Sequence, residues 1–169
     1  MKKEYWVEEQ QALKFESELR SFLFQKADML RLTYEPWTEG FFWWRVRHGA
    51  ENDPEWIRTK ENLRLFFMKK VVNNKRFNDL EQGKWKYTHY FFRLTRKIKD
   101  MLTHETLFWS VNPPVAGGPF YCFEDPTFYK GDDLIGGVIS DMPYVFLYLT
   151  DTERKQLEKK GLLLSINKN

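Results

Sequence analysis

Cysteine is almost absent from this chain of 169 residues, because Cys122 is the only one. A single cysteine excludes an internal disulfide, and its place between aromatic residues favours a small buried strand residue over a nucleophile. A chain of this length buries roughly 70% of the surface that its unfolded form exposes. It therefore needs neither a disulfide nor a structural metal to fold.

Histidine is also scarce, and His48, His89 and His104 share no spacing that is typical of metal ligands. The sequence has no phosphate-binding loop, dinucleotide fingerprint or nucleophile elbow. We therefore expect no cofactor and no metal, and we expect a protein that is not an enzyme. An enzyme with a site assembled from residues around 104–133 is one alternative. Its candidate groups are His104, Glu105, Cys122, Glu124, Asp125, Asp132 and Asp133.

Long hydrophobic runs are missing as well. The longest uncharged stretch, 106–123, contains Pro113, Pro114 and Gly117, which would break a membrane-spanning helix. The first fifteen residues contain acidic and basic side chains in place of the apolar core of a secretory signal. These features predict a cytoplasmic protein with no membrane partner.

Aromatic residues, by contrast, are abundant. Seven Trp, eight Tyr and fifteen Phe exclude a globally disordered chain. The residue patterns predict a single α+β domain over residues 1–169, with a helical half at about 1–104 and a sheet-rich half at about 105–169. In this prediction the N-terminal helices pack on a largely antiparallel C-terminal sheet.

The predicted elements follow from hydrophobic periodicity and from turn residues. The predicted helices are 8–30, 54–72, 86–102 and 151–160, and the predicted strands are 40–48, 106–111, 119–124, 134–140, 143–149 and 162–166. Thr150 and Glu153 have the spacing of a capping box at the start of the last helix. The predicted core contains Phe15, Leu19, Phe22, Trp44, Phe67, Tyr90, Phe91, Leu94, Ile98, Phe146 and Leu149.

Charge is distributed unevenly along the chain. The segment from Arg58 to Lys99 has thirteen basic and three acidic residues, whereas the segment from Glu105 to Asp141 has six acidic residues and one basic residue. The formal charge of the whole chain is only +3. This asymmetry indicates a basic half that contacts an anionic partner, or two halves that attract each other in a homo-oligomer.

Two groups of residues are candidates for the partner contact. In the predicted helix 86–102, Lys86, Arg93, Arg96 and Lys97 recur on one face, opposite an aromatic stripe. In the predicted strand 40–48, Trp43, Arg45 and Arg47 share one face, a combination suited to stacking and to bidentate contact with anions. In each case the alternative is a solvated face on which the long side chains cover apolar surface.

The sequence therefore favours a small cytoplasmic protein-binding module of the regulator, inhibitor or immunity kind. We expect an acidic protein surface as its partner, because surplus aromatic residues and arginine are typical of protein interfaces. A nucleic-acid-binding protein that uses the basic 58–99 region is the main alternative.

Overall fold

The computed structural model describes residues 1–34, 54–74, 87–104, 118–120, 123–139 and 144–166. The strands are β1 (Lys3–Glu8), β2 (Met29–Tyr34), β3 (Phe67–Asn73), β4 (Tyr87–Arg93), β5 (Phe123–Lys130), β6 (Asp133–Ile139), β7 (Tyr144–Leu149) and β8 (Ser165–Ile166). The helices are α1 (Glu9–Lys14), α2 (Glu16–Lys26), α3 (Pro54–Leu63), α4 (Arg96–His104) and α5 (Asp151–Lys159), with a 3₁₀ turn, η2 (Arg64–Phe66), after α3.

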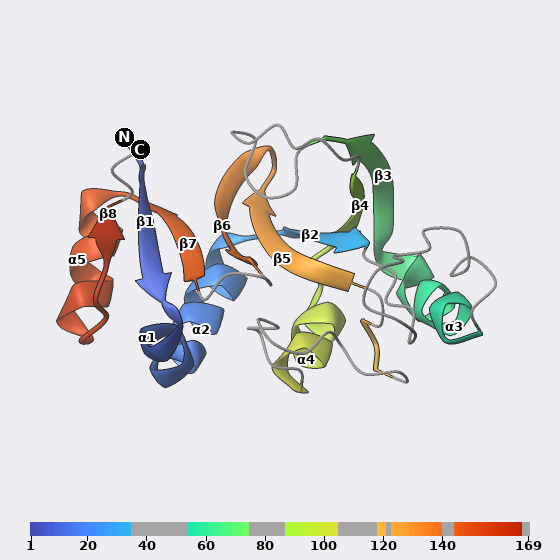
Figure 1. Ribbon diagram of the computed structural model, residues 1–169, viewed down its shortest axis with the longest axis horizontal. Helices are drawn as coiled ribbons and strands as arrows, with labels where there is room; N and C mark the ends of the chain where they lie inside the picture. The colour runs from blue at the N-terminus through green and yellow to red at the C-terminus, as the bar shows by residue number, and fades with distance from the viewer. Residues whose placement is uncertain (35–53, 75–86, 105–117, 121–122, 140–143, 167–169) are drawn as a thin grey trace, which may run out of the picture.

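All eight strands join one antiparallel sheet in the order β3-β4-β2-β5-β6-β7-β1-β8. The protein is a single α+β domain, as the sequence predicts (Figure 1). Strand β1 lies between β7 and β8, so that Tyr5 is paired with Leu147 on one side and with Ile166 on the other. This pairing holds the two ends of the chain together at one end of the sheet.

The core lies between the sheet and helices that cover one of its faces. Leu30 and Leu32 of β2 are fully buried, together with Leu19 of α2 and Ile98 of α4. In Figure 1, α1, α2 and α4 lie along the same side of the sheet, while α3 stands beside the β3 end and α5 beside β8. Helix α3 adds Trp56 to the same core.

The N-terminal part of the chain contains more strand than predicted. The predicted helix 8–30 is broken at Phe15 into α1 and α2, and residues 29–34 form the central strand β2. The predicted helix 54–72 begins at Pro54 as expected but ends at Leu63, and residues 67–73 are strand β3. Sheet pairing therefore overrides helical spacing in both places.

The predicted helix 86–102 is also wrong, because residues 87–93 form strand β4 and a helix begins only at Arg96. Thr95 separates the two elements, and its Oγ1 accepts a hydrogen bond from the backbone N–H of Ile98 at 3.4 Å. That contact is typical of a helix N-cap. The aromatic run of β4 satisfies helical spacing by coincidence.

The C-terminal predictions agree better with the structure. Strands β6 and β7 match the predicted strands 134–140 and 143–149, and α5 begins with the predicted capping box of Thr150 and Glu153. The predicted strand 119–124 is displaced to 123–130, and only residues 165–166 of the predicted last strand are extended. The predicted strands 40–48 and 106–111 lie outside the described residues.

Most of the predicted core is at least partly buried. Leu19, Leu94, Ile98, Phe146 and Leu149 are buried, and Phe15, Phe22, Tyr90 and Phe91 are partly buried. Phe67 is wrong, because 46% of it is exposed on the edge strand β3. Trp44 lies outside the described residues.

Candidate functional site

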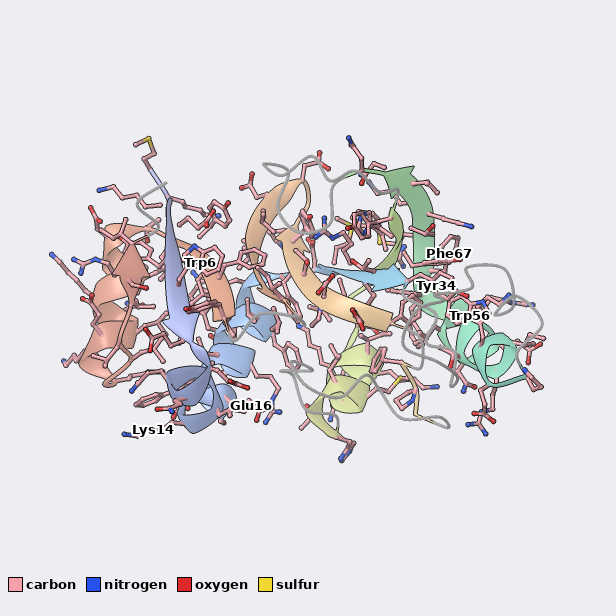
Figure 2. All side chains as sticks on the ribbon, viewed as in Figure 1. Trp6, Lys14, Glu16, Tyr34, Trp56 and Phe67 are labelled. Carbon is pink, nitrogen blue, oxygen red and sulfur yellow. The ribbon has the colours of Figure 1, made fainter. Side chains whose placement is uncertain are left out.

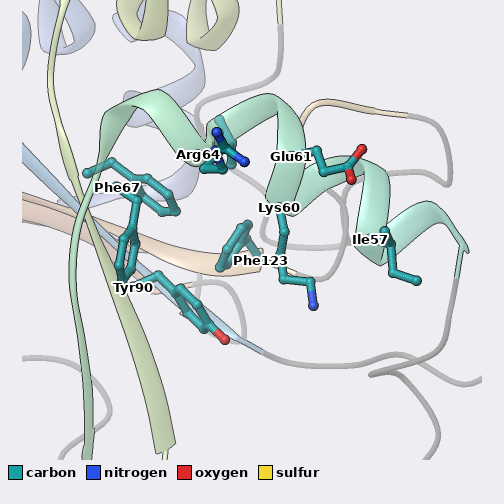
Figure 3. Close-up of a pocket in the computed structure, with 9 residues that line it drawn as sticks. Ile57, Lys60, Glu61, Arg64, Phe67, Tyr90 and Phe123 are labelled. Atoms are coloured by element: carbon teal, nitrogen blue, oxygen red, sulfur yellow. The ribbon is translucent and has the colours of Figure 1, made fainter.

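A pocket of about 410 Å³ lies where α3 and η2 cross the end of the sheet. Its lining residues are Ile57, Lys60, Glu61, Leu63, Arg64, Phe67, Tyr90, Phe92 and Phe123, and we call it the aromatic pocket. Figure 3 shows the rings of Phe67, Tyr90 and Phe123 gathered beneath the helix, with Lys60 reaching down from α3 beside Phe123.

Helical spacing explains how α3 supplies one wall of the aromatic pocket. Ile57, Lys60 and Arg64 recur every three or four residues and so share one face of the helix and its 3₁₀ extension. A second face carries Trp56, Thr59 and Leu63, all of which are buried. The buried face fixes the helix on the sheet and leaves the other face over the pocket.

Aromatic packing makes the floor of the pocket rigid. The ring centres of Trp56 and Phe123 are 5.2 Å apart, those of Tyr90 and Phe123 are 5.5 Å apart, and those of Phe92 and Phe123 are 5.7 Å apart. The three pairs meet edge to face, which is a favourable arrangement for aromatic rings. The floor is therefore formed by side chains that already have partners in the core.

Exposed apolar side chains are concentrated on the elements that form this pocket, and two of them, Ile57 and Phe67, line it. Figure 2 labels Phe67 at this end of the sheet. Ile57, Leu65, Phe67, Met68 and Val72 are exposed by 39%, 84%, 46%, 48% and 54%, and all five lie on α3, η2 or β3. Elsewhere in the described residues, the large exposed apolar side chains are Met1, Leu13, Leu163 and Ile166. Such a concentration is typical of a surface that contacts another molecule.

Cationic side chains border the aromatic pocket, and we call Lys60, Arg64 and Lys70 the cationic rim. The Nζ of Lys60 lies 5.4 Å from the ring centre of Trp56, and the Nζ of Lys70 lies 5.6 Å from that of Tyr90. Lys60, Arg64 and Lys70 are all exposed. Glu61 is the one acidic side chain that lines the pocket, so the charge around the opening is predominantly positive.

The predicted basic stripe on a helix 86–102 does not exist as one helical face. Arg93 ends strand β4, whereas Arg96 and Lys97 begin helix α4, and Lys86 lies outside the described residues. Arg93, Arg96 and Lys97 are exposed. Lys97 lies beside the segment that forms the pocket, because its Nζ is 5.8 Å from the ring centre of Phe66 in η2.

The predicted aromatic and arginine face of strand 40–48 is not tested by the structure. Trp43, Arg45 and Arg47 all lie outside the described residues.

The described acidic residues of the segment from Glu105 to Asp141 do not form one surface. Glu124 and Asp125 are buried at the start of β5, whereas Asp132 and Asp133 are exposed beyond its far end. The extended strand between them separates the two pairs by roughly 15–20 Å, at about 3.3 Å per residue. These four acids therefore share neither a cation site nor a docking surface.

The face of the sheet opposite the core carries buried polar side chains. The Nη2 of Arg31 donates to the Oγ1 of Thr127 at 3.0 Å, and Arg31 is 3% exposed. His89 lies between Thr33 and Asn73, with each ring nitrogen 3.2 Å from a side-chain oxygen. Because these groups are buried and hydrogen-bonded, they hold the sheet together rather than offer a surface to a partner.

A second pocket, of about 470 Å³, lies at the other end of the sheet. Its lining includes Trp6, Glu8, Gln11, Glu158 and the segment 161–165. Its charged lining residues are acidic, and Trp6 is its one aromatic lining residue. The second pocket therefore lacks the aromatic floor and the cations of the aromatic pocket.

Sequence reasoning missed most of the aromatic pocket. Ile57 and Arg64 fall in a segment that was expected to be entirely helical, and Tyr90 was expected on a helix rather than a strand. One signal was available: the consecutive aromatic residues Tyr90, Phe91 and Phe92 of β4, which favour a strand.

The chain matches no protein-family model, no curated protein and no solved structure. Among the helices that the structure describes, none has the length and apolar character needed to cross a membrane. Within the same residues, no group of three or more His, Cys, Asp or Glu side chains is arranged to hold a metal ion.

Proposed function

We propose that this protein is a protein-binding module whose contact surface is the aromatic pocket with its cationic rim. The observation that carries the proposal is the coincidence of exposed apolar side chains with a pocket floored by aromatic rings. Interfaces gain most of their binding energy from a few large side chains seated in such pockets, and charges around the pocket guide the partner toward it. The cationic rim favours a partner with an acidic surface.

The proposed contact surface differs from the residues that the sequence favoured. Arg93 and Arg96 remain available as outlying cations, and Lys97 adjoins the pocket through Phe66. A cytoplasmic setting and a regulatory role remain part of the proposal.

The experiment compares three tagged forms of the full chain as baits in an extract of the source cells. One is the wild type, one carries Lys60→Glu with Arg64→Glu, and the control carries Lys155→Glu with Lys159→Glu. Both double variants reverse two exposed cations four residues apart, and each includes the last turn of a helix. The control variant therefore shows any general effect of reversing two positive charges near the end of a helix.

We expect a partner that the wild type and the control retain and that the Lys60→Glu, Arg64→Glu form loses. With that partner purified, the association rate should fall by about tenfold or more in this form and should depend on ionic strength in the wild type. Capture of the same proteins by all three forms would contradict the proposal. Salt-dependent binding of a generic oligonucleotide by the wild type would favour a nucleic-acid-binding function instead.

A further inference from the structure

Strand β3 forms one edge of the sheet in the part of the chain that the structure describes. Its pairing with β4 runs from Phe67 to Asn73, and its opposite side has no neighbour among the described strands. Phe67, Met68, Lys69, Lys70 and Val72 are all exposed. An exposed edge strand presents backbone N–H and C=O groups that can pair with an added strand.

The register of β3 places its side chains on two faces. Phe67 and Lys70 are paired with Phe92 and Tyr90, which line the aromatic pocket. Lys69 is paired with Phe91, on the opposite face. A strand added along β3 would thus direct every second side chain toward the pocket side of the sheet.

The aromatic pocket and the edge of β3 belong to one surface, because Phe67 is part of both. A neighbouring strand would run about 4.8 Å from β3, which brings its side chains within reach of the pocket opening. The volume of about 410 Å³ lies in the usual range of sites that enclose a small organic group, so it can hold one large apolar side chain.

Charge determines which strand fits this edge. Lys69 and Lys70 project from opposite faces of β3, and Lys60 and Arg64 stand over the pocket side. A bulge lies between Phe67 and Lys69 in the pairing with β4. Edge lysines and bulges disfavour pairing with a second copy of the same edge, because like charges would then face each other. An acidic segment would instead be attracted on both faces.

We infer that the partner contributes an extended acidic segment that adds a strand to β3 and places one large apolar side chain in the aromatic pocket. This inference rests on the proposed function and names the partner's chemistry and its mode of docking. Main-chain pairing would supply affinity, and the acidic side chains together with the one apolar side chain in the pocket would supply specificity.

The first test selects peptides of about ten residues, a length typical of strands, from a random display library against the immobilised full chain. We expect the enriched sequences to be rich in acidic residues at positions of both faces, with one aromatic or long aliphatic residue at a fixed position. Ile57→Asp should abolish their binding, whereas the control Leu13→Asp, which changes an exposed apolar residue of α1, should not. Enrichment of basic sequences, or of none, would overturn the inference.

The second test uses the best selected peptide with N-methyl groups on its backbone. Methylation of alternate residues whose N–H groups face β3 should weaken binding by about tenfold to a hundredfold, since two or three hydrogen bonds are lost. Methylation of the intervening residues should change affinity by less than about threefold, because those N–H groups face solvent. Equal effects of the two methylation patterns would show that the peptide does not pair as a strand.

Hydrogen exchange with the captured partner distinguishes strand addition to β3 from the proposed function alone. Hydrogen exchange of the full chain should slow at the amides of residues 67–73 when the partner binds, as expected for an edge strand that gains hydrogen bonds. Protection confined to α3, with partner capture still lost on Lys60→Glu and Arg64→Glu, would overturn strand addition and leave the proposed function standing.

Discussion

Gly136 of β6 is paired with Leu147 of β7, and the space beside it does not hold a side chain. A Cβ at this position would lie 2.5 Å from the backbone oxygen of Phe146 and 2.9 Å from a side-chain carbon of Leu147. We expect Gly136→Ala to lower the free energy of unfolding by about 2–3 kcal/mol, in the range of overpacked cores, because backbone must move to relieve the contact. Urea denaturation measures this change.

The control for this prediction is Gly131, in the turn between β5 and β6. Gly131 has φ +57° and no atom within 4 Å of the added Cβ. Asparagine tolerates this left-handed conformation, so Gly131→Asn should cost less than about 1 kcal/mol. A Gly136→Ala protein as stable as the wild type would mean that β6 and β7 do not pair at Gly136 and Leu147.

At the scale of the element, helix α5 depends on its cap and on a link to α2. Thr150 Oγ1 accepts from the backbone N–H of Glu153 at 3.3 Å, and Glu153 Oε2 accepts from the backbone N–H of Thr150 at 2.9 Å. Lys26, the last residue of α2, lies 2.7 Å from Glu153 Oε1. Partial burial alone would raise the pKa of Glu153, but the hydrogen bonds from Lys26 and Thr150 outweigh burial and lower its pKa to about 2.

The lowered pKa of Glu153 predicts how stability depends on pH. Because the folded state holds this proton less tightly than the unfolded state, ionised Glu153 stabilises the protein above about pH 4.5, and this contribution is lost as the pH falls through about 2. Glu153→Gln should cost about 1 kcal/mol at neutral pH, and the difference from the wild type should shrink over that interval. Chemical denaturation at a series of pH values measures it.

Glu158→Gln is the matched control on the same helix. Glu158 pairs with Arg154 at 2.7 Å near the surface, and its removal should cost less than about 0.5 kcal/mol, as for other exposed i,i+4 pairs. If Glu153→Gln and Glu158→Gln have equal effects at neutral pH, the capping box and the link to Lys26 do not stabilise α5.

Local signals predicted α5 and strands β6 and β7, because a capping box and closely spaced turn residues are encoded within a few positions. The sheet could not be predicted in the same way. Strand β1 pairs with β7, whose residues lie more than 130 positions away, and nothing in the sequence of β1 identifies that partner. The helical spacing of Tyr87, Tyr90 and Phe91 was equally misleading, because β2 and β3 on either side of β4 fix that segment as a strand.

The candidate site was only partly predictable for the same reason. The sequence shows an excess of positive charge in 58–99, but its predicted placement on one helix was wrong. The pocket depends on α3 lying over β4 and β5, which are separated in sequence by the whole of α4. Local periodicity carries no information about such an arrangement.

At the scale of the whole molecule, the sheet has two unlike ends. The β3 edge carries Lys69 and Lys70 with exposed apolar neighbours, whereas the β8 edge is only two residues long. Glu124 and Asp125, which were expected to give the second half of the chain an acidic surface, are buried. Among the described acids of that segment, Asp132 and Asp133 are exposed at the turn between β5 and β6.

This arrangement predicts a monomer whose edge is protected by charge. Lys69→Thr with Lys70→Thr removes both lysines from an edge strand, keeps a residue that favours strands, and leaves Phe67, Met68 and Val72 exposed. We expect this variant to self-associate reversibly, so that its weight-average mass in analytical ultracentrifugation rises with protein concentration.

The control Lys155→Thr with Lys159→Thr, on α5, should sediment as the wild type does. A wild type that is already dimeric, or a Lys69→Thr, Lys70→Thr form that stays monomeric, would contradict the role of these lysines, because repulsion between like charges is what we expect to keep two such edges apart.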